Sequence, residues 1–207
     1  NREALEAVKI AFGANSERGW LLFNVIRLMI EVGEPQKVEP MLKKMIALEP
    51  TFFNARYYLA NYYLEKGDLD NAIREYRQAL KFRPNSTNFN LYFNLGSALE
   101  QKGDLAGAVT EFRHAVKVNP KFSEAHFNLG SILLIRNDVD GAISEYLQTI
   151  TLNPDNAEAH YNIALAYMAK GDTASALPEF RAYIRLSHGE KEKQKTREFI
   201  RQLGITL

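Results

Sequence analysis

Small and bulky apolar residues return along this chain at a regular interval. Each interval contains an alanine followed four residues later by an aromatic side chain: Ala72 with Tyr76, Ala108 with Phe112, Ala142 with Tyr146, and Ala176 with Phe180. Two stretches of about 14 residues in each interval carry apolar positions at the spacing of one helix face. The pattern predicts helix pairs that cannot bury their apolar faces alone and therefore stack on their neighbours.

The residues between these stretches predict the turns. Prolines recur at spacings of 34, 36 and 34 residues, at Pro50, Pro84, Pro120 and Pro154. Glycine recurs near the middle of each interval, with Asn137 replacing it once, and both residue types tolerate the left-handed conformation that ends a helix. In four intervals an aspartate follows and suits the N-cap of the next helix: Asp68, Asp104, Asp138 and Asp172.

Taken together, these positions resemble the tetratricopeptide repeat (TPR). They comprise leucine beside a small residue, a Gly-Asp turn, alanine, an aromatic residue and proline, at a spacing of 34 residues. The resemblance implies an all-α fold, a right-handed α-solenoid of antiparallel helix pairs. It predicts five repeats, at 19–52, 53–86, 89–122, 123–156 and 157–190. The first repeat is degenerate, with Val38 at the alanine position, although it keeps Gly33 and Pro50.

The two ends of the chain depart from the repeat. Residues 1–18 are predicted to form the second helix of an incomplete N-terminal repeat plus a linker, and residues 191–207 a C-terminal capping helix. Because the chain lacks an initiator methionine and begins within a repeat, we expect a fragment of a longer protein. Its first helix would carry an unpaired apolar face (Leu5, Val8 and Phe12), which offers one route to a homo-oligomer.

Composition and charge narrow the range of partners. Apolar residues make up 46% of the 207 residues and the net charge is +1, whereas nucleic-acid-binding domains are usually strongly basic. No apolar run approaches the roughly 18 residues of a membrane span. The absence of cysteine excludes disulfides and thiolate metal sites. We expect a soluble protein, cytoplasmic in preference to periplasmic, with no nucleic-acid partner and no direct insertion into a membrane.

The sequence offers little catalytic chemistry. His126 and His160 occupy the fourth position of successive repeats, where we expect packing residues wedged between two helices. No carboxylate recurs beside them at the spacing of a metal site. Phosphate-binding glycine loops and nucleophile motifs are also missing from the sequence. We therefore expect no enzyme activity, no catalytic residues, no metal and no cofactor.

In the TPR family the first helices of the repeats line a concave groove. Asparagine recurs at the sixth position of the repeat, at Asn24, Asn94, Asn128 and Asn162, with Tyr58 in the second repeat. A carboxamide both donates and accepts hydrogen bonds, so a row of them can pair with an extended peptide backbone. The row resembles the asparagine ladder in the TPR superhelix of O-GlcNAc transferase. The alternative is that these asparagines only cap helices or hydrogen-bond between helices.

Aromatic residues recur at the fifth position, where they either floor an apolar groove or pack between neighbouring first helices. Arg27 is the only cation at the predicted groove positions, so a clamp for a C-terminal carboxylate, as in chaperone-type TPRs, is not expected. The predicted peptide-binding residues are Asn24, Tyr57, Asn61, Asn90, Phe93, Asn94, Ser97, Phe127, Asn128, Ser131, Tyr161 and Asn162.

The sequence thus predicts a protein–protein interaction module, an adaptor or scaffold that binds an extended peptide or partner segment in its concave groove. Two alternatives stay open: a self-assembling structural scaffold, and the recruiting or regulatory TPR part of a larger enzyme.

Overall fold

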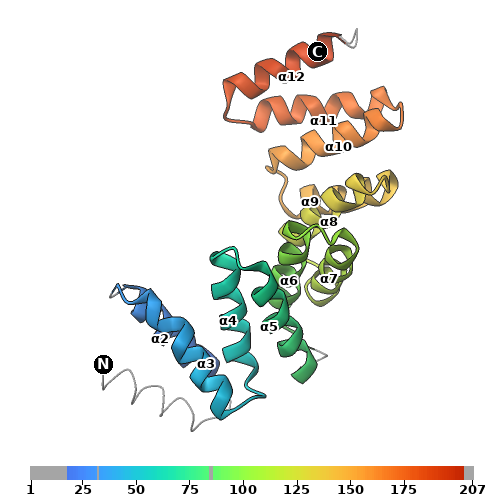
Figure 1. The fold of residues 1–207 in the computed structure, drawn as a ribbon. Coiled ribbons are helices and arrows are strands. Elements are labelled where there is room, and N and C mark those ends of the chain that lie inside the picture. Colours follow the sequence, from blue (N-terminus) through green and yellow to red (C-terminus); the bar gives the residue numbers. More distant parts are fainter. Residues whose placement is uncertain (1–17, 32, 84–85, 203–207) are drawn as a thin grey trace. The chain divides into compact units, whose positions relative to one another are not determined.

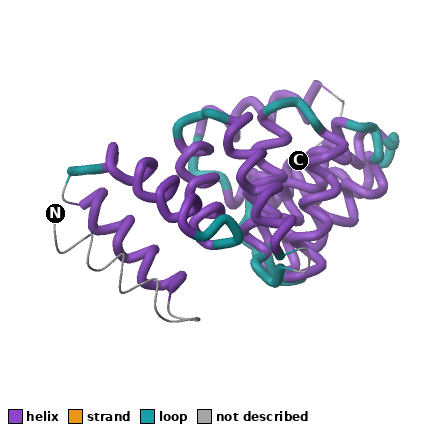
Figure 2. The backbone as a smooth tube through the Cα atoms, turned by 60° about the horizontal axis from the view of Figure 1, so that its bottom comes forward, coloured by secondary structure: helices purple, strands orange, loops and turns teal. Residues whose placement is uncertain are grey.

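The computed structural model describes residues 18–31, 33–83 and 86–202, and these are almost entirely helical (Figure 1). Figure 2 shows helices joined by short loops, with no strand in the described ranges. The expected all-α fold of helix pairs is confirmed. In order, the elements are α2 (Arg18–Glu31), the 3-10 helix η1 (Pro35–Lys37), α3 (Val38–Leu48), α4 (Phe53–Glu65), α5 (Leu69–Phe82), α6 (Phe89–Gln101), α7 (Leu105–Val118), α8 (Ser123–Ile135), α9 (Val139–Leu152), α10 (Ala157–Ala169), α11 (Thr173–Leu186) and α12 (Glu190–Gln202).

The turn between the two helices of a pair has the predicted chemistry. Asn137 has φ 62°, and glycine has a positive φ at each equivalent position, Gly33, Gly67, Gly103 and Gly171. Except after Gly33, the next helix is then capped by an aspartate, for example where Asp138 accepts a hydrogen bond from the Gly141 amide at 3.1 Å. Both expectations for the turn are confirmed.

Close approach of the two helices explains why a small residue such as Gly96 or Gly130 stands in the first helix. A Cβ added to Gly130 would lie 2.9 Å from the ring of Tyr146, and one added to Gly96 would lie 2.9 Å from the ring of Phe112. The ring on the second helix therefore packs directly against the backbone of the first. The second-helix rings of Tyr76, Phe112, Tyr146 and Phe180 are each at most 1% exposed, so these four rings belong to the core.

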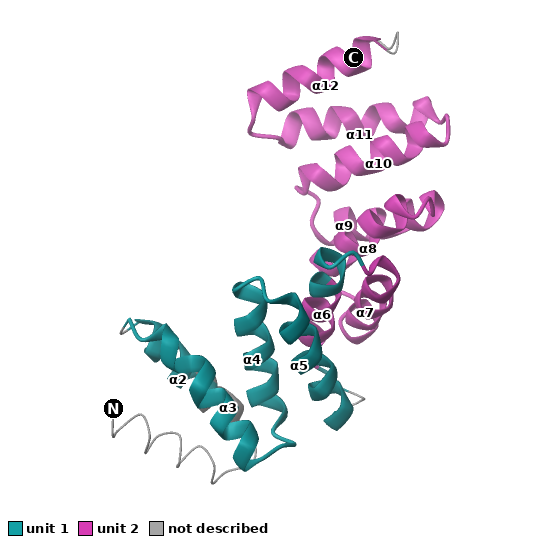
Figure 3. Cartoon of the chain, viewed as in Figure 1, with its two compact units in different colours: residues 1–87, 97–103 teal, residues 88–96, 104–207 magenta. Residues whose placement is uncertain are grey.

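The chain divides into two compact units, which Figure 3 distinguishes by colour. Unit 1 comprises residues 1–87 and 97–103, and unit 2 comprises residues 88–96 and 104–207. The described part of unit 1 holds α2 to α5 and the last turn of α6, and α4 contacts α2, α3 and α5. Unit 2 holds the start of α6 and then α7 to α12. In unit 2, α8 contacts α7, α9 and α10, and α10 contacts α9 and α11.

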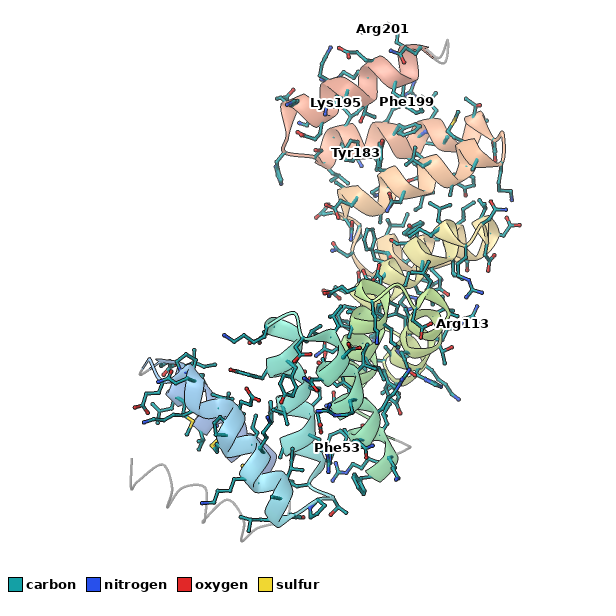
Figure 4. All side chains as sticks on the ribbon, viewed as in Figure 1. Phe53, Arg113, Tyr183, Lys195, Phe199 and Arg201 are labelled. Atoms are coloured by element: carbon teal, nitrogen blue, oxygen red, sulfur yellow. The ribbon has the colours of Figure 1, made fainter. Side chains whose placement is uncertain are left out.

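The structure describes only one of the two predicted end segments. The predicted N-terminal helix, with its unpaired apolar face, lies outside the described residues. At the other end, α12 packs on α11 and buries Thr196 and Ile200. The Phe199 ring lies 5.9 Å from that of Phe180, on the side of α12 that faces α11 (Figure 4). The repeat limits and the capping role of this helix stay predictions.

Candidate functional site

The predicted peptide-binding residues fall into two groups, one on each unit. Unit 1 carries Asn24, Tyr57, Asn61 and Ser97. The others form what we call the unit 2 face, on the start of α6 and on the contacting helices α8 and α10: Asn90, Phe93, Asn94, Phe127, Asn128, Ser131, Tyr161 and Asn162. Asn90 is exposed and the other residues of this face are half-buried, so all of them keep some surface toward solvent.

The sixth-position asparagines do not share one environment. Asn162 forms a side-chain hydrogen bond with the hydroxyl of Tyr146, sixteen residues before it. Asn128 stands sixteen residues after Phe112, which has no hydroxyl to offer. Within the part of the chain that the structure describes, the Asn128 carboxamide has no hydrogen-bond partner. Asn24 and Asn94 each have an interaction within the protein.

Two predicted binding residues at the ninth position are engaged by the second helix. The Tyr146 hydroxyl donates to Ser131 Oγ at 3.1 Å, and Ser131 itself donates to the Phe127 carbonyl at 3.0 Å. In unit 1, the Tyr76 hydroxyl donates to Asn61 Oδ1 at 2.6 Å. These polar side chains therefore satisfy a buried tyrosine, a role that the sequence interpretation did not include.

The fifth-position aromatics pack against the second helix of their own repeat. Their ring centroids lie 5.5 to 6.3 Å from the second-helix ring nineteen residues later: Tyr57 with Tyr76, Phe93 with Phe112, Phe127 with Tyr146, and Tyr161 with Phe180. The rings are nevertheless only half-buried. Part of each ring thus packs in the core while part of it stays accessible to solvent.

The fourth-position residues make a polar bridge that sequence reasoning missed. His126 Nδ1 lies 2.6 Å from Glu145 Oε2, and its Nε2 lies 3.1 Å from the Pro120 carbonyl oxygen. His160 repeats the arrangement with Glu179 at 2.6 Å and the Pro154 carbonyl at 3.2 Å. The histidines do sit between two helices, as expected, but as polar bridges.

In the second repeat an arginine makes the same bridge. Arg56 donates to Glu75 at 2.9 Å and to the Pro50 carbonyl at 2.9 Å. The recurrence of glutamate nineteen residues after His126, His160 and Arg56 was the sequence signal that could have revealed this bridge.

The environment of His126 favours its charged form. The hydrogen bond to Glu145 raises the pKa of His126, burial opposes this, and the Pro120 carbonyl raises it further. Because a carbonyl oxygen and a carboxylate both accept, each ring nitrogen must carry a proton to satisfy them. The bridge is therefore complete only in the imidazolium form.

Unit 1 contains a pocket of about 270 Å³ between the first helices α2 and α4. Ile26, Ile30, Val38, Tyr58 and Tyr62 form its apolar walls. Its polar lining consists of Arg27, Glu31, Asn61 and Glu65. For comparison, a cavity of about 150 Å³ suffices for benzene. The pocket therefore has room for a large side chain.

The described ranges contain neither a candidate metal site nor a helix that could span a membrane. No group of three or more His, Cys, Asp or Glu residues there could hold a metal ion. Likewise, none of the described helices combines the length and apolar character needed to cross a membrane.

Comparison with known families identifies the repeats. A family model described as "TPR repeat" matches residues 60–103, 96–134 and 130–171. Models described as "Tetratricopeptide repeat" match residues 41–74 and 157–187. No curated protein matches the chain.

Solved structures show the same fold. The chain is 23% identical to YrrB, described as a TPR protein with an unusual peptide-binding site, with a TM-score of 0.77 over 93% of this chain and 98% of YrrB. It is 24% identical to a MamA structure, with a TM-score of 0.72 over 81% of this chain and 95% of MamA. MamA from Desulfovibrio magneticus RS-1 is 20% identical, with a TM-score of 0.72 over 84% of this chain and 97% of that one. These likenesses establish the fold.

Proposed function

The chain belongs to the tetratricopeptide-repeat family, and we propose that it is a protein–protein interaction module whose unit 2 face binds an extended segment of a partner protein. The proposed role is to hold the partner without transforming it. YrrB, which shares the fold, is described as having a peptide-binding site, and this supports a peptide as the ligand.

One observation carries the proposal. Asn128 is half-buried on α8 and its carboxamide has no hydrogen-bond partner among the described residues. A polar group that is partly removed from water without a partner is destabilising, and a ligand that supplies the partner recovers that free energy. The carboxamide can donate to a peptide carbonyl and accept from a peptide N–H at once.

The surroundings of Asn128 suit a backbone ligand. Phe127 and Tyr161 are half-buried aromatic residues on the contacting helices α8 and α10, and they can cover the apolar parts of a bound segment. Asn162 lies one repeat further along, on α10. This arrangement supports the finer proposal that the asparagines contact a peptide backbone in the manner of the O-GlcNAc transferase ladder.

Selection from a displayed library of random 12-residue peptides tests the proposal with the 207-residue chain as bait. We expect enriched peptides that bind the purified chain, and Asn128→Ala should weaken that binding about tenfold, or about 1.4 kcal/mol. The matched control is Gln148→Ala, which truncates an exposed amide on the second helix α9 and should leave affinity unchanged.

Two results would contradict the proposal. One is the absence of any enriched peptide. The other is an equal affinity for the wild type and Asn128→Ala, with an unchanged melting temperature showing that the variant is folded.

A further inference from the structure

The unit 1 pocket has the form of a receptor for an apolar side chain. Val38 is 2% exposed, whereas Ile30, on the pocket wall, is 53% exposed. Large aliphatic surface that lies open in a concave site is a common feature of protein-interaction sites. The half-buried rings of Tyr58 and Tyr62 add rigid walls that can contact a bound side chain over a large area.

The charges at this pocket are not balanced. Arg27 Nε and Glu31 Oε1 form an exposed pair at 3.7 Å on α2. Glu65, on α4, is exposed and has no ion-pair partner in the ranges that the structure describes. The nearby Lys66 amine lies over the Tyr62 ring, 5.7 Å from its centroid. The charged lining residues therefore leave one uncompensated negative charge, that of Glu65.

A second carboxylate in unit 1 also lacks an ion-pair partner in the described ranges. Glu100 is half-buried at the C-terminal end of α6, and burial raises the pKa of its carboxyl group. No cation is paired with it among the described residues. Unit 1 thus carries two carboxylates, Glu65 and Glu100, that would gain from a positively charged ligand.

We propose that the unit 1 pocket binds a large apolar side chain of the partner protein, and that a lysine or arginine within two residues of that side chain contacts Glu65. The inference rests on the proposed function and adds the sequence class of the ligand. Neighbouring residues of an extended peptide are about 3.3 Å apart along the chain, so the two side chains can reach the pocket and its rim together. Burial of the apolar side chain in the pocket supplies affinity, and the ion pair between Glu65 and the basic residue of the ligand supplies selectivity.

The same 12-residue library, selected separately against the wild type and Glu65→Lys, tests this ligand class. Peptides that the wild type selects and Glu65→Lys does not should contain a large apolar residue within two positions of Lys or Arg. Replacing that basic residue by Glu should weaken binding to the wild type about tenfold and restore it on Glu65→Lys. Asp155→Lys, an exposed charge reversal in the loop before α10, is the matched control and should not change the preference.

The outcomes separate this inference from the proposed function. If peptides that respond to Asn128→Ala are selected but no peptide with the apolar–basic pair is, the pocket inference is wrong and the proposed function stands. The same conclusion follows if folded Glu65→Lys, checked by circular dichroism, keeps the wild-type preference. If the wild type enriches no peptide, both are wrong.

Discussion

The imidazole of His126 and the carboxylate of Glu145 lie 2.6 Å apart and join the two helices of one repeat, α8 and α9. The second ring nitrogen extends the link to the carbonyl of Pro120, just after α7. One side chain therefore connects three consecutive segments of the chain. Because both partners accept hydrogen bonds, the connection depends on the charge of the ring.

The His126 bridge should make stability depend on pH. The folded pKa is raised above the usual value of 6.5, so this group stabilises the fold fully below about pH 6.5. The stabilisation is lost as pH rises through the folded pKa. We expect the melting temperature, measured by circular dichroism, to fall between pH 6 and pH 9.

His126→Arg is the control for other titrating groups. Arg56 makes the same bridge in the second repeat and stays charged throughout this range. The difference in melting temperature between the wild type and His126→Arg should therefore change with pH, in favour of the arginine variant at high pH. A constant difference from pH 6 to pH 9 would refute the charged bridge.

Tyr146→Phe should destabilise the fold by about 1 kcal/mol. The substitution removes the hydroxyl that donates to Ser131 and hydrogen-bonds with Asn162, and both of these groups are half-buried. Urea unfolding gives the change in free energy. Ser131→Ala should lower the free energy of unfolding by less in the Tyr146→Phe background than in the wild type. Equal losses in the two backgrounds would argue against the hydrogen bond.

Phe112→Tyr should weaken peptide binding from within the core. It places a hydroxyl sixteen residues before Asn128, the spacing at which Tyr146 engages Asn162. Once Asn128 has an internal partner, a peptide must displace it, so we expect several-fold lower affinity by calorimetric titration. An unchanged affinity in the folded variant would show that the free state of Asn128 is irrelevant to binding.

Asn137→Ala should destabilise the fold by about 1 kcal/mol, since alanine is strained in the left-handed region. Asn137→Gly should be tolerated, because glycine holds the equivalent turn position in the other repeats. Thermal melting of the two variants checks this. Equal losses from both would show that the asparagine side chain, and not the backbone conformation, determines stability at this turn.

The helices and turns could be predicted because their signals are local. The alanine and aromatic spacing, the left-handed turn at Asn137 and the cap at Asp138 each depend on residues a few positions apart. The longer spacing of 36 residues between Pro84 and Pro120 was also visible in the sequence. One boundary of the two compact units, after Thr87, falls within this interval, although the sequence did not predict that division.

The chemistry of the candidate site could be predicted only in part. The partial exposure of Asn128 agrees with its predicted position, but its lack of a partner among the described residues depends on Phe112 in the preceding helix pair. Ser131 and Asn61 looked like ligand contacts because their tyrosine partners lie fifteen residues later, on another helix. Such pairs follow from how the helices meet in three dimensions, which a repeat pattern does not specify residue by residue.

The side-chain amide resonances of Asn128, followed in ¹⁵N-resolved NMR spectra while a selected peptide is added, test the central claim most directly. A new hydrogen bond from this carboxamide to the peptide should shift its two amide protons, and the shift should saturate with the affinity measured by calorimetry. Resonances that stay in place while the peptide binds would show that the ligand is held elsewhere, and the proposed role of Asn128 would be wrong.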